Sequence, residues 1–403
     1  MQLVADGRLR PGDDADRRRT RHARPDRPLV MILCPGGLED GGGIGRQMGY
    51  FLGVPAGPPV SIEYRMMDTR GPWYLGGAPW RSVLAFAYFA AAAMRLVGLA
   101  LRRRTCVLHV NVTGRGSTVR KAVLTGLARL LGLGYLLHVH DPDYAVGYAA
   151  LPAAAQAAVR RMFRGARLVL VLGHADRERL ASVLEVPPAR FVVLHNAVPD
   201  PYPAGLSPAA RSGPCRFVFL GHLSDRKGVP ELLQALAHPG MAGRSWRATI
   251  AGGGPVEDYR ARATALGLGD RVDFPGWVDA AGVRQFCVEG DVLVLPSHAE
   301  GLAMAVLEGM SHGMAIVTTA VGAHPEVIEP GRSGLFVEPG DIDGLAATLG
   351  ELVDHPERRS RLGAAARRRF ETAFEVRAYA ARLGALHAEV LRQGLGSEER
   401  ECP

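Results

Sequence analysis

Two glutamates in residues 297–308, which read SHAEGLAMAVLE, are the first candidates for chemistry. Glu300 and Glu308 are eight positions apart, and one continuous helix would separate them by about 80° around its axis and ~12 Å along it. If Glu300 instead lies where a loop joins the helix, both carboxylates can accept hydrogen bonds from one extended ligand, such as a nucleotide-sugar. The helix start near Gly301 and Leu302 would then suit its diphosphate. A capping acid and a surface residue fit the spacing equally well.

A group of potential cations follows another apolar run, in residues 217–228, FVFLGHLSDRKG. His222, Arg226 and Lys227 would lie at the carboxyl end of a buried strand, where each charge-assisted hydrogen bond to a phosphate oxygen contributes ~1.5–3 kcal/mol. Lys227 is one of only two lysines in an arginine-rich chain. That rarity favours a phosphate-anchoring role over an ordinary basic loop before a helix.

Two glycine-rich loops also follow apolar runs. The first reads PGGLEDGGGIG and contains Gly42 and Gly43, and the second reads AGGGP and contains Gly252 and Gly254. Glycines allow backbone amides to approach a ligand closely. No register of the first loop matches the G-x-G-x-x-G pattern of dinucleotide-binding proteins. A loop without a ligand is the alternative for each.

Histidines cluster at the ends of two further apolar runs. His138 and His140 would share one face of a strand, because side chains alternate along it, and Asn111 would end the neighbouring strand. No H-E-x-x-H or comparable ligand set accompanies them, so we expect no metal. We expect His140 to contact a sugar or an acceptor at the strand tip and His138 to be structural.

The segment TGRGSTVRK, just after Asn111, supplies candidates for holding an anionic acceptor. They are Asn111 itself with Ser117, Arg120 and Lys121. A solvated helix start is the alternative.

Short apolar runs alternate with helical stretches along the chain, which is typical of βα units around parallel sheets. The expected strands are 29–34, 60–63, 107–111, 135–140, 168–172, 191–194, 216–220, 248–251, 272–274, 292–295, 315–318 and 335–337. Five prolines between residues 198 and 214 suit a linker. The pattern predicts an α/β fold with two Rossmann-like, doubly wound domains facing across a cleft.

The expected parts of the chain follow from these elements. They are a disordered basic tail at 1–28, an amino-terminal domain at 29–200, a linker at 201–214, a carboxy-terminal domain at 215–375, and a last helix with a tail at 376–403. The final helical stretch, roughly 360–393, is amphipathic, and we expect it to pack back across the domain boundary.

The composition narrows the classes of function. The chain has 403 residues, 47% hydrophobic and 22% charged, so it can bury a sizeable core. Five cysteines without paired spacing argue against a disulfide scaffold and against a cysteine zinc site. No secretory signal is recognisable at the start, so we expect a cytoplasmic protein. The net charge of +8 favours polyanionic partners, but no motif for nucleic-acid recognition accompanies it.

One apolar segment allows two interpretations. Residues 82–101 are interrupted by Arg95 and followed by three arginines. We expect a buried helix whose carboxyl end is stabilised by these arginines. Peripheral contact of the basic end with an anionic membrane, at its inner face, is the alternative. No run of eighteen uncharged apolar residues predicts a membrane span.

Taken in order, these motifs resemble glycosyltransferase family 4, the retaining nucleotide-sugar transferases with the GT-B fold. The matching pieces are FLGHLSDRKGVPELLQA, AGGGP, RVDFPGWV, SHAEGLAMAVLEGM, TAVGAHPEVI and GRSGLFV, and the resemblance covers most of residues 29–375. HVNVTGRGSTVRK and HVHD are similar to a subgroup associated with bacterial exopolysaccharide and lipid-linked oligosaccharide assembly. The resemblance implies a UDP- or GDP-sugar donor, a glycan or lipid-diphosphate-sugar acceptor, no cofactor and no obligatory metal.

The resemblance also implies roles by position. Glu300 would lie near the donor sugar, Glu308 would bind the ribose and Lys227 would hold the diphosphate. The other matches are Val278 near the base, Gly42 and Gly43 near the phosphates and the acceptor, and His140 against the transferred sugar. In the family's favoured mechanism the leaving diphosphate accepts the proton of the incoming hydroxyl, so the enzyme positions the reactants and stabilises charge.

Departures from the family pattern keep other functions open. His222 stands where an arginine is usual, although Arg226 could compensate, and Ala303 stands where a proline is common. A catalytically silent nucleotide-sugar-binding partner of a polysaccharide assembly complex is therefore one alternative. Another is an NAD-dependent oxidoreductase, because Glu63 would end the strand after the glycine loop, as the ribose-binding acid of a dehydrogenase does.

Overall fold

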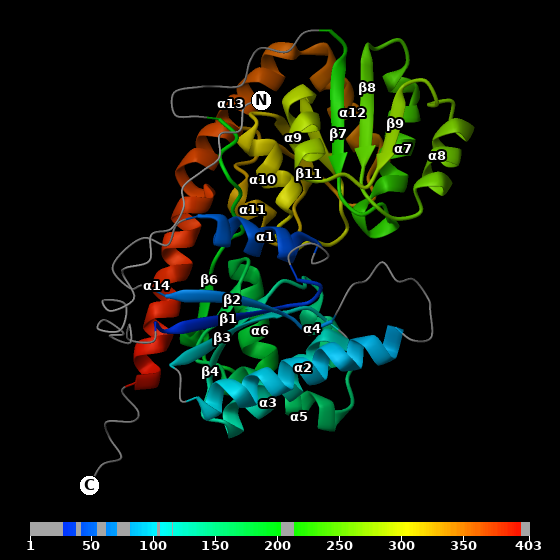
Figure 1. Cartoon of the computed structure of the whole chain (residues 1–403). Helices are drawn as coiled ribbons and strands as arrows, with labels where there is room; N and C mark the ends of the chain where they lie inside the picture. Colours follow the sequence, from blue (N-terminus) through cyan, green and yellow to red (C-terminus); the bar gives the residue numbers. More distant parts are fainter. Residues whose placement is uncertain are drawn as a thin grey trace, which may run out of the picture.

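The computed structural model describes residues 27–37, 42–54, 62–70, 81–102, 105–114, 116–202 and 213–395. Within these ranges the chain forms two parallel six-stranded sheets flanked by helices (Figure 1). The expected α/β class with two doubly wound domains is confirmed. Most of the expected tail at 1–28 and of the expected linker at 201–214, together with residues 396–403, lies outside the described residues.

The amino-terminal sheet has the strand order β2-β1-β3-β4-β5-β6. Every residue of β1 and β3 is buried, because helices cover both faces of an internal parallel strand. The strands are β1 (Leu29–Cys34), β2 (Glu63–Asp68), β3 (Cys106–Val112), β4 (Gly134–Val139), β5 (Val169–Val171) and β6 (Phe191–Val193). The helices are α1 (Gly42–Gly53), α2 (Arg81–Leu101), α3 (Gly116–Leu130), α4 (Tyr144–Ala149), α5 (Ala153–Gly165) and α6 (His174–Leu184), with the 3-10 turn η1 (Pro188–Arg190).

Residues 60 and 61 of the expected strand at 60–63 lie outside the described residues, and the observed strand β2 begins only at Glu63 and continues to Asp68. β2 is an edge strand and is mostly half-exposed, so it has no continuous apolar run to mark it. Glu63 lies at the amino end of β2 and pairs with Arg65. Ligands of doubly wound sheets bind at the carboxyl ends of the strands, so the dehydrogenase-like role of Glu63 has no geometric support.

The carboxy-terminal sheet has the order β12-β11-β10-β7-β8-β9, which is the doubly wound arrangement of dinucleotide-binding domains. Its strands are β7 (Cys215–Leu220), β8 (Trp246–Ala251), β9 (Val272–Gly276), β10 (Val292–Leu295), β11 (Ala315–Thr319) and β12 (Leu335–Val337). Its helices and 3-10 turns are η2 (Asp225–Lys227), α7 (Val229–Ala237), η3 (Pro239–Met241), α8 (Val256–Ala265), α9 (Ala280–Glu289), α10 (Met304–Ser311), α11 (His324–Val327), α12 (Ile342–Asp354) and α13 (Pro356–Ala373).

Helix α2 lies along the surface of the amino-terminal domain, and the expectation of a buried helix is wrong. Only 17% of its window Val83–Leu101 is buried. This helix is long and apolar enough to cross a membrane by length and composition alone. Ala92, Leu96 and Leu99 nevertheless pack into the amino-terminal core, so one face of α2 is held by the protein.

The last helical stretch is two helices, since α13 ends at Ala373 and α14 (Val376–Leu395) follows. Between them Glu375 forms a parallel bridge with Val198. Helix α14 then runs beside the amino-terminal sheet, where Leu383 and Val390 share an apolar cluster with Val30 of β1 (Figure 1). Helix α14 therefore packs into the amino-terminal domain.

Candidate functional site

The two donor-side motifs converge on one carboxylate. Lys227 Nζ donates a hydrogen bond to Glu300 Oε1 at 2.5 Å, and Ser297 Oγ donates to the same oxygen at 2.8 Å. Glu300 is 6% exposed. An ammonium beside a nearly buried carboxylate is a desolvated ion pair with a fixed orientation.

Neighbouring strands bring these residues together. β7 and β10 are paired and parallel, so the loops after them leave the sheet at the same edge. Two hydrogen bonds join the loops: His298 N donates to the Arg226 carbonyl at 2.9 Å, and the Arg226 side chain donates through Nη1 to the Ala299 carbonyl at 3.0 Å. Gly228 closes the turn at φ +73°, where a Cβ would lie 2.1 Å from Pro296 O. This turn therefore requires glycine.

The second glutamate is held from the opposite domain. Glu308 lies on α10, is 5% exposed, and accepts a hydrogen bond from Arg46 Nη1 of α1 at 2.9 Å. Burial raises the pKa of Glu308, while Arg46 and the Tyr50 hydroxyl, which also bonds to it, act in the opposite direction. Arg46 and Tyr50 were missed from the sequence. The available signal was a basic residue four positions after the start of the helix that follows the glycine loop.

His140 lies just past the end of β4 and faces the donor-side loop. Its Nε2 is 2.8 Å from Asn111 Oδ1, and Asn111 Nδ2 donates to Leu33 O. The Asn111 oxygen must therefore accept, which places the proton of the neutral His140 ring on Nε2. Burial lowers the pKa of His140 to about 3, so the ring is neutral at physiological pH. A Cβ on Gly301 would lie 3.2 Å from His140 O, so the two domains meet here.

A chain of buried histidines extends behind His140. The rings of His138 and His140 are 4.1 Å apart at their centroids. His138 Nδ1 lies 3.2 Å from His109 Nε2, and His109 Nδ1 lies 3.0 Å from His387 Nε2 on α14. His138 is thus a packed residue behind the site, in line with the expected structural role.

The glycine loops differ in what they contact. Gly42, at φ +57°, and Gly43 are exposed at the start of α1, and a Cβ on Gly43 would lie 3.9 Å from Met304 at the start of α10. The starts of these two helices therefore face each other across the domain boundary. Gly252 and Gly254 also have positive φ, but a Cβ on them would lie 1.7 Å from Gly221 O and 2.6 Å from Leu223 O. Packing of two loops explains this second pair without a ligand.

The remaining donor-side candidates surround the Lys227–Glu300 pair. His222 is exposed beside the Gly254 loop, and Arg226 is also exposed. Val278 is half-buried against the carboxy-terminal core. Leu302 is buried, and its carbonyl accepts a hydrogen bond from Asn196 of the amino-terminal domain at 2.9 Å.

The acceptor-side candidates are mostly turned into the protein, and the expected acceptor contact from Lys121 is wrong. Lys121 has no exposed surface and donates to Thr69 Oγ1 at 2.6 Å. Burial lowers its pKa to about 7. Asn111 is likewise fully buried and orients His140 instead of contacting an acceptor. Ser117 is buried and Arg120 half-buried at the start of α3.

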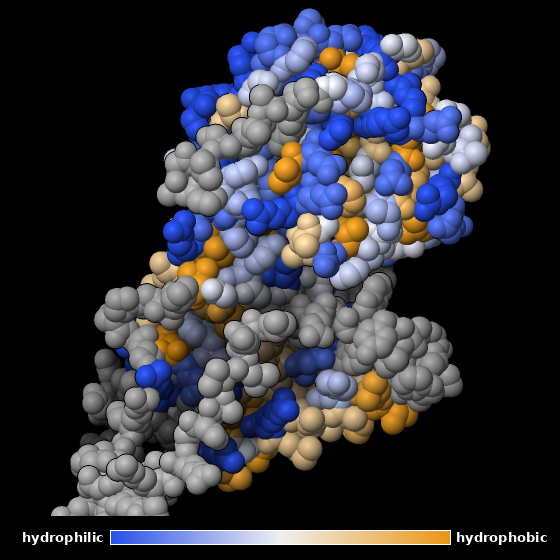
Figure 2. Space-filling model, turned by 45° about the horizontal axis from the view of Figure 1, so that its top comes forward, coloured by the Kyte–Doolittle hydropathy of each residue, from blue (hydrophilic) through white to orange (hydrophobic). Residues whose placement is uncertain are grey.

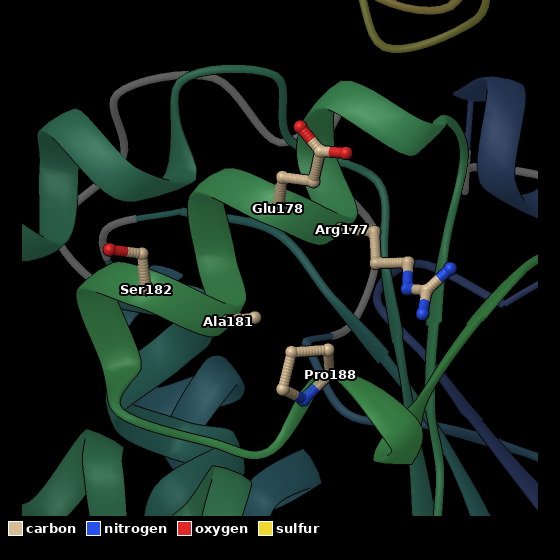
Figure 3. Close-up of a pocket in the computed structure, with 5 residues that line it drawn as sticks. All are labelled: Arg177, Glu178, Ala181, Ser182 and Pro188. Carbon is tan, nitrogen blue, oxygen red and sulfur yellow. The ribbon is translucent and has the colours of Figure 1, made fainter.

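A cavity of about 530 Å³ lies against α6 and η1, lined by Arg177, Glu178, Ala181, Ser182 and Pro188, and contains none of the expected site residues (Figure 3). Among the described residues, no group of three or more His, Cys, Asp or Glu side chains could hold a metal ion.

Comparison with known families gives this arrangement a context. The model described as "Glycosyl transferase 4-like domain" matches residues 30–197, and "Glycosyl transferases group 1" matches residues 207–369. The chain belongs to glycosyltransferase family 4. This family-4 chain is 28% identical over 360 residues to the GDP-mannose-dependent alpha-(1-6)-phosphatidylinositol monomannoside mannosyltransferase of Mycobacterium tuberculosis, covering 81% of this chain and 89% of the relative.

Other relatives match the family-4 chain less completely. It is 32% identical over 173 residues to the glycogen synthase of M. tuberculosis, covering 41% of this chain and only 40% of that relative. The solved structure of HepE from Anabaena in complex with UDP has a TM-score of 0.67 and 15% identity, covering 90% of this chain and 100% of that one. This structural likeness shows the shared GT-B fold.

Proposed function

We propose that this chain is a retaining glycosyltransferase that moves a hexose-type sugar from a UDP- or GDP-sugar to a glycan or lipid-diphosphate-sugar acceptor. The observation that carries the proposal is the convergence of Lys227 and Glu300 beside the backbone of His140. One basic group, one acid and one neutral imidazole from two domains are the groups needed around a sugar diphosphate.

In this proposal Lys227 stabilises the negative charge that grows on the leaving diphosphate. Its ammonium is already oriented by Glu300 and its side chain is only 15% exposed, so little reorganisation precedes the reaction. Arg226 and His222 are exposed next to it and can bind the outer phosphate oxygens. Glu300 accepts from the sugar, and Glu308, once released by Arg46, accepts from the ribose.

The acceptor side of the proposal rests on fewer side chains. His140 has a free lone pair on Nδ1 once its proton is placed on Nε2, so it can accept a hydrogen bond from a sugar hydroxyl. Two acceptor-binding candidates remain at the start of α3: Arg120 is half-buried, and the buried Ser117 hydroxyl has no hydrogen-bond partner among the described residues, so it can bond to an acceptor. The phosphatidylinositol mannoside named for one relative supports a lipid-linked acceptor. We also propose that the enzyme acts in the cytoplasm, in peripheral contact with the inner face of an anionic membrane.

A panel of UDP-, GDP- and ADP-sugars in a thermal-shift assay tests donor binding, because a ligand that binds only the folded state raises the melting temperature. The donor that binds is then used in a transfer assay, with NMR of the anomeric proton to follow the configuration. We expect a retained anomer. An inverted product, or no shift with any nucleotide-sugar, would contradict the proposal.

A catalytically silent binding partner is the second candidate, favoured by His222 at a position where the family usually has an arginine. Calorimetry separates the two candidates. Donor binding without transfer or hydrolysis, across glycan and lipid-linked acceptors, supports the silent partner.

A further inference from the structure

Three neighbouring helices form one outer layer of the amino-terminal domain. Helix α3 packs against α2 on one side and against α5 on the other (Figure 1). Because α3 follows β3, this layer begins at the carboxyl edge of the sheet, where the proposed acceptor residue Ser117 lies. We call this outer layer the α2–α3–α5 face.

Apolar side chains of α2 and α3 are exposed over much of the α2–α3–α5 face. Phe86 and Met94 of α2 are 68% and 69% exposed, and Leu130 of α3 is 87% exposed. The exposed apolar residues are Val83, Phe86, Met94, Val97 and Leu101 on α2 and Val119, Val123 and Leu130 on α3. Their spacings of three, four, seven and eight positions make a stripe along each helix. Figure 2 shows hydrophobic atoms gathered along the lower edge of the amino-terminal domain.

The apolar stripes are separate from the surfaces that the core already uses. Ala92 and Leu96 of α2 and Leu124 and Ala128 of α3 are buried in the amino-terminal core. Each helix therefore has one apolar face that is packed and a second that is exposed. A contiguous apolar surface of this kind marks an interaction site, whereas single exposed apolar residues do not.

Arginines line the α5 side of the same face. A cavity of about 470 Å³ is lined by Arg129 of α3 and by Arg160, Arg161 and Arg164 of α5, with Ala157 and Gly165. Within this group Arg129 donates to the Arg161 carbonyl, Arg160 to the Tyr148 hydroxyl, and Arg164 to Glu185. Three arginines are thus held in place, and one of them has a carboxylate partner.

The three helices contain no acidic residue at all. The helices of the other domain differ, since α8, α12 and α13 each carry aspartates or glutamates. Exposed Arg95 of α2 and exposed Arg102, directly after α2, add positive charge to this face. Apart from Glu185 beside Arg164, the face thus combines apolar stripes with arginines. Such a surface is complementary to an anionic bilayer, whose headgroups attract the arginines and whose acyl region accepts the stripes.

We propose that the α2–α3–α5 face docks on an anionic lipid bilayer, with the stripes of α2 and α3 in the interface and a lipid phosphate in the arginine-lined cavity. This inference rests on the proposed function, which it deepens by naming the surface and its ligand chemistry. In this orientation the carboxyl edge of the amino-terminal sheet opens beside the membrane, where a lipid-linked acceptor can reach it.

Co-sedimentation with phosphatidylglycerol-containing and with pure phosphatidylcholine vesicles tests the surface. We expect binding to the anionic vesicles only, weakened at least tenfold by Phe86→Glu with Met94→Glu and by Arg161→Glu with Arg164→Glu. The matched controls are Val288→Glu, an exposed apolar residue on α9, and Arg361→Glu with Arg368→Glu on α13, and these should bind like wild type. Equal binding to both vesicle types, or full binding by the face variants, overturns the proposal.

Two further measurements do not depend on the charge-reversal variants being folded, and they test whether the face binds a second copy of the chain. Met94→Trp should show a blue-shifted difference spectrum when anionic vesicles are added, and no shift contradicts insertion of the stripe. A dimer in analytical ultracentrifugation that Phe86→Glu dissociates, without vesicle binding, would assign the face to a second copy of the chain. Donor binding measured without vesicles separates the two proposals. A protein that binds vesicles but no donor contradicts the proposed glycosyltransferase function. A protein that binds a donor but no vesicles contradicts the proposed docking surface.

Discussion

The donor side and the acceptor side of the domain boundary use their polar residues differently. On the donor side, Lys227 lies at the end of a strand and reaches a carboxylate from the neighbouring strand's loop. On the acceptor side, the chain's other lysine, Lys121, is on a helix and is fully enclosed by the amino-terminal domain. Lys227 therefore lies at the proposed site, whereas Lys121 is part of the amino-terminal core.

The difference lies in which elements carry the residues. Lys227 and Glu300 sit in loops after paired strands, which must leave the sheet at the same edge. Lys121 sits on the packed side of α3, one helical turn before Thr125, which is also buried. A polar residue after a strand therefore predicts a site better than one inside the following helix, where rotation about the helix axis decides its exposure.

The largest expected effect is on the rate of sugar transfer. Lys227→Ala and Glu300→Gln should each lower sugar transfer by about 10²–10³-fold, because each removes a charged group from the proposed diphosphate site. Lys121→Met is the matched control and should keep the rate within about twofold. A steady-state assay with saturating donor measures this. If the two lysine variants lose activity equally, the contrast between the two sides is wrong.

The second effect is on stability and concerns the ion pair between Arg46 and Glu308, which joins the two domains. Arg46→Ala should lower the free energy of unfolding by about 3 kcal/mol at pH 7.5, because buried Glu308 loses its partner. Burial already raises the pKa of Glu308, so the charged form is the unfavourable one in the folded protein. The loss should therefore shrink as the pH falls and Glu308 takes up a proton.

Urea denaturation at several pH values measures the Arg46 effect. Arg65→Ala, which removes a surface ion pair with Glu63, is the control and should change the unfolding free energy by less than about 1 kcal/mol. Two outcomes would argue that Glu308 needs no partner. In one, Arg46→Ala lowers the free energy of unfolding as little as the control does; in the other, its effect on that free energy grows as the pH falls.

The third effect is the contribution of buried Lys121 to the pH dependence of the free energy of unfolding. Burial lowers the pKa of Lys121 to about 7, below its value in the unfolded chain, so the folded state binds fewer protons above pH 7. The stability contributed by this group therefore rises with pH, by up to about 1.4 kcal/mol per unit between pH 7 and 10. Lys121→Met should lack this rise when thermal melts are compared at pH 7 and 9. Parallel pH profiles for the two proteins would show that Lys121 is solvated.

The smallest expected effect is on donor affinity. His222→Arg should tighten donor binding roughly fivefold, because an exposed guanidinium adds about 1 kcal/mol of charge-assisted bonding to the phosphates. Isothermal calorimetry at pH 7.5 measures it, with His238→Arg on the far side of α7 as the control. Weaker binding by His222→Arg would place His222 away from the phosphates.

Much of the fold and half of the site could be predicted from local sequence. Internal strands such as β3 and β10 are apolar runs because both of their faces are buried. The Lys227 and Glu300 motifs follow such strands, so their convergence followed from sheet geometry. The edge strand β2 was misplaced because one of its sides meets no other strand and its residues need not be apolar.

Tertiary packing alone decided the rest. Arg46 and Glu308 are 262 positions apart, and their contact exists only because the two domains dock with α1 facing α10. The apolar composition of α2 was visible in the sequence, but which of its faces is packed depends on where the helix lands on the sheet. Local sequence determines the periodicity of apolar residues and where strands and helices follow one another along the chain. Burial depends on which surfaces meet, and those surfaces come from residues far apart in the sequence.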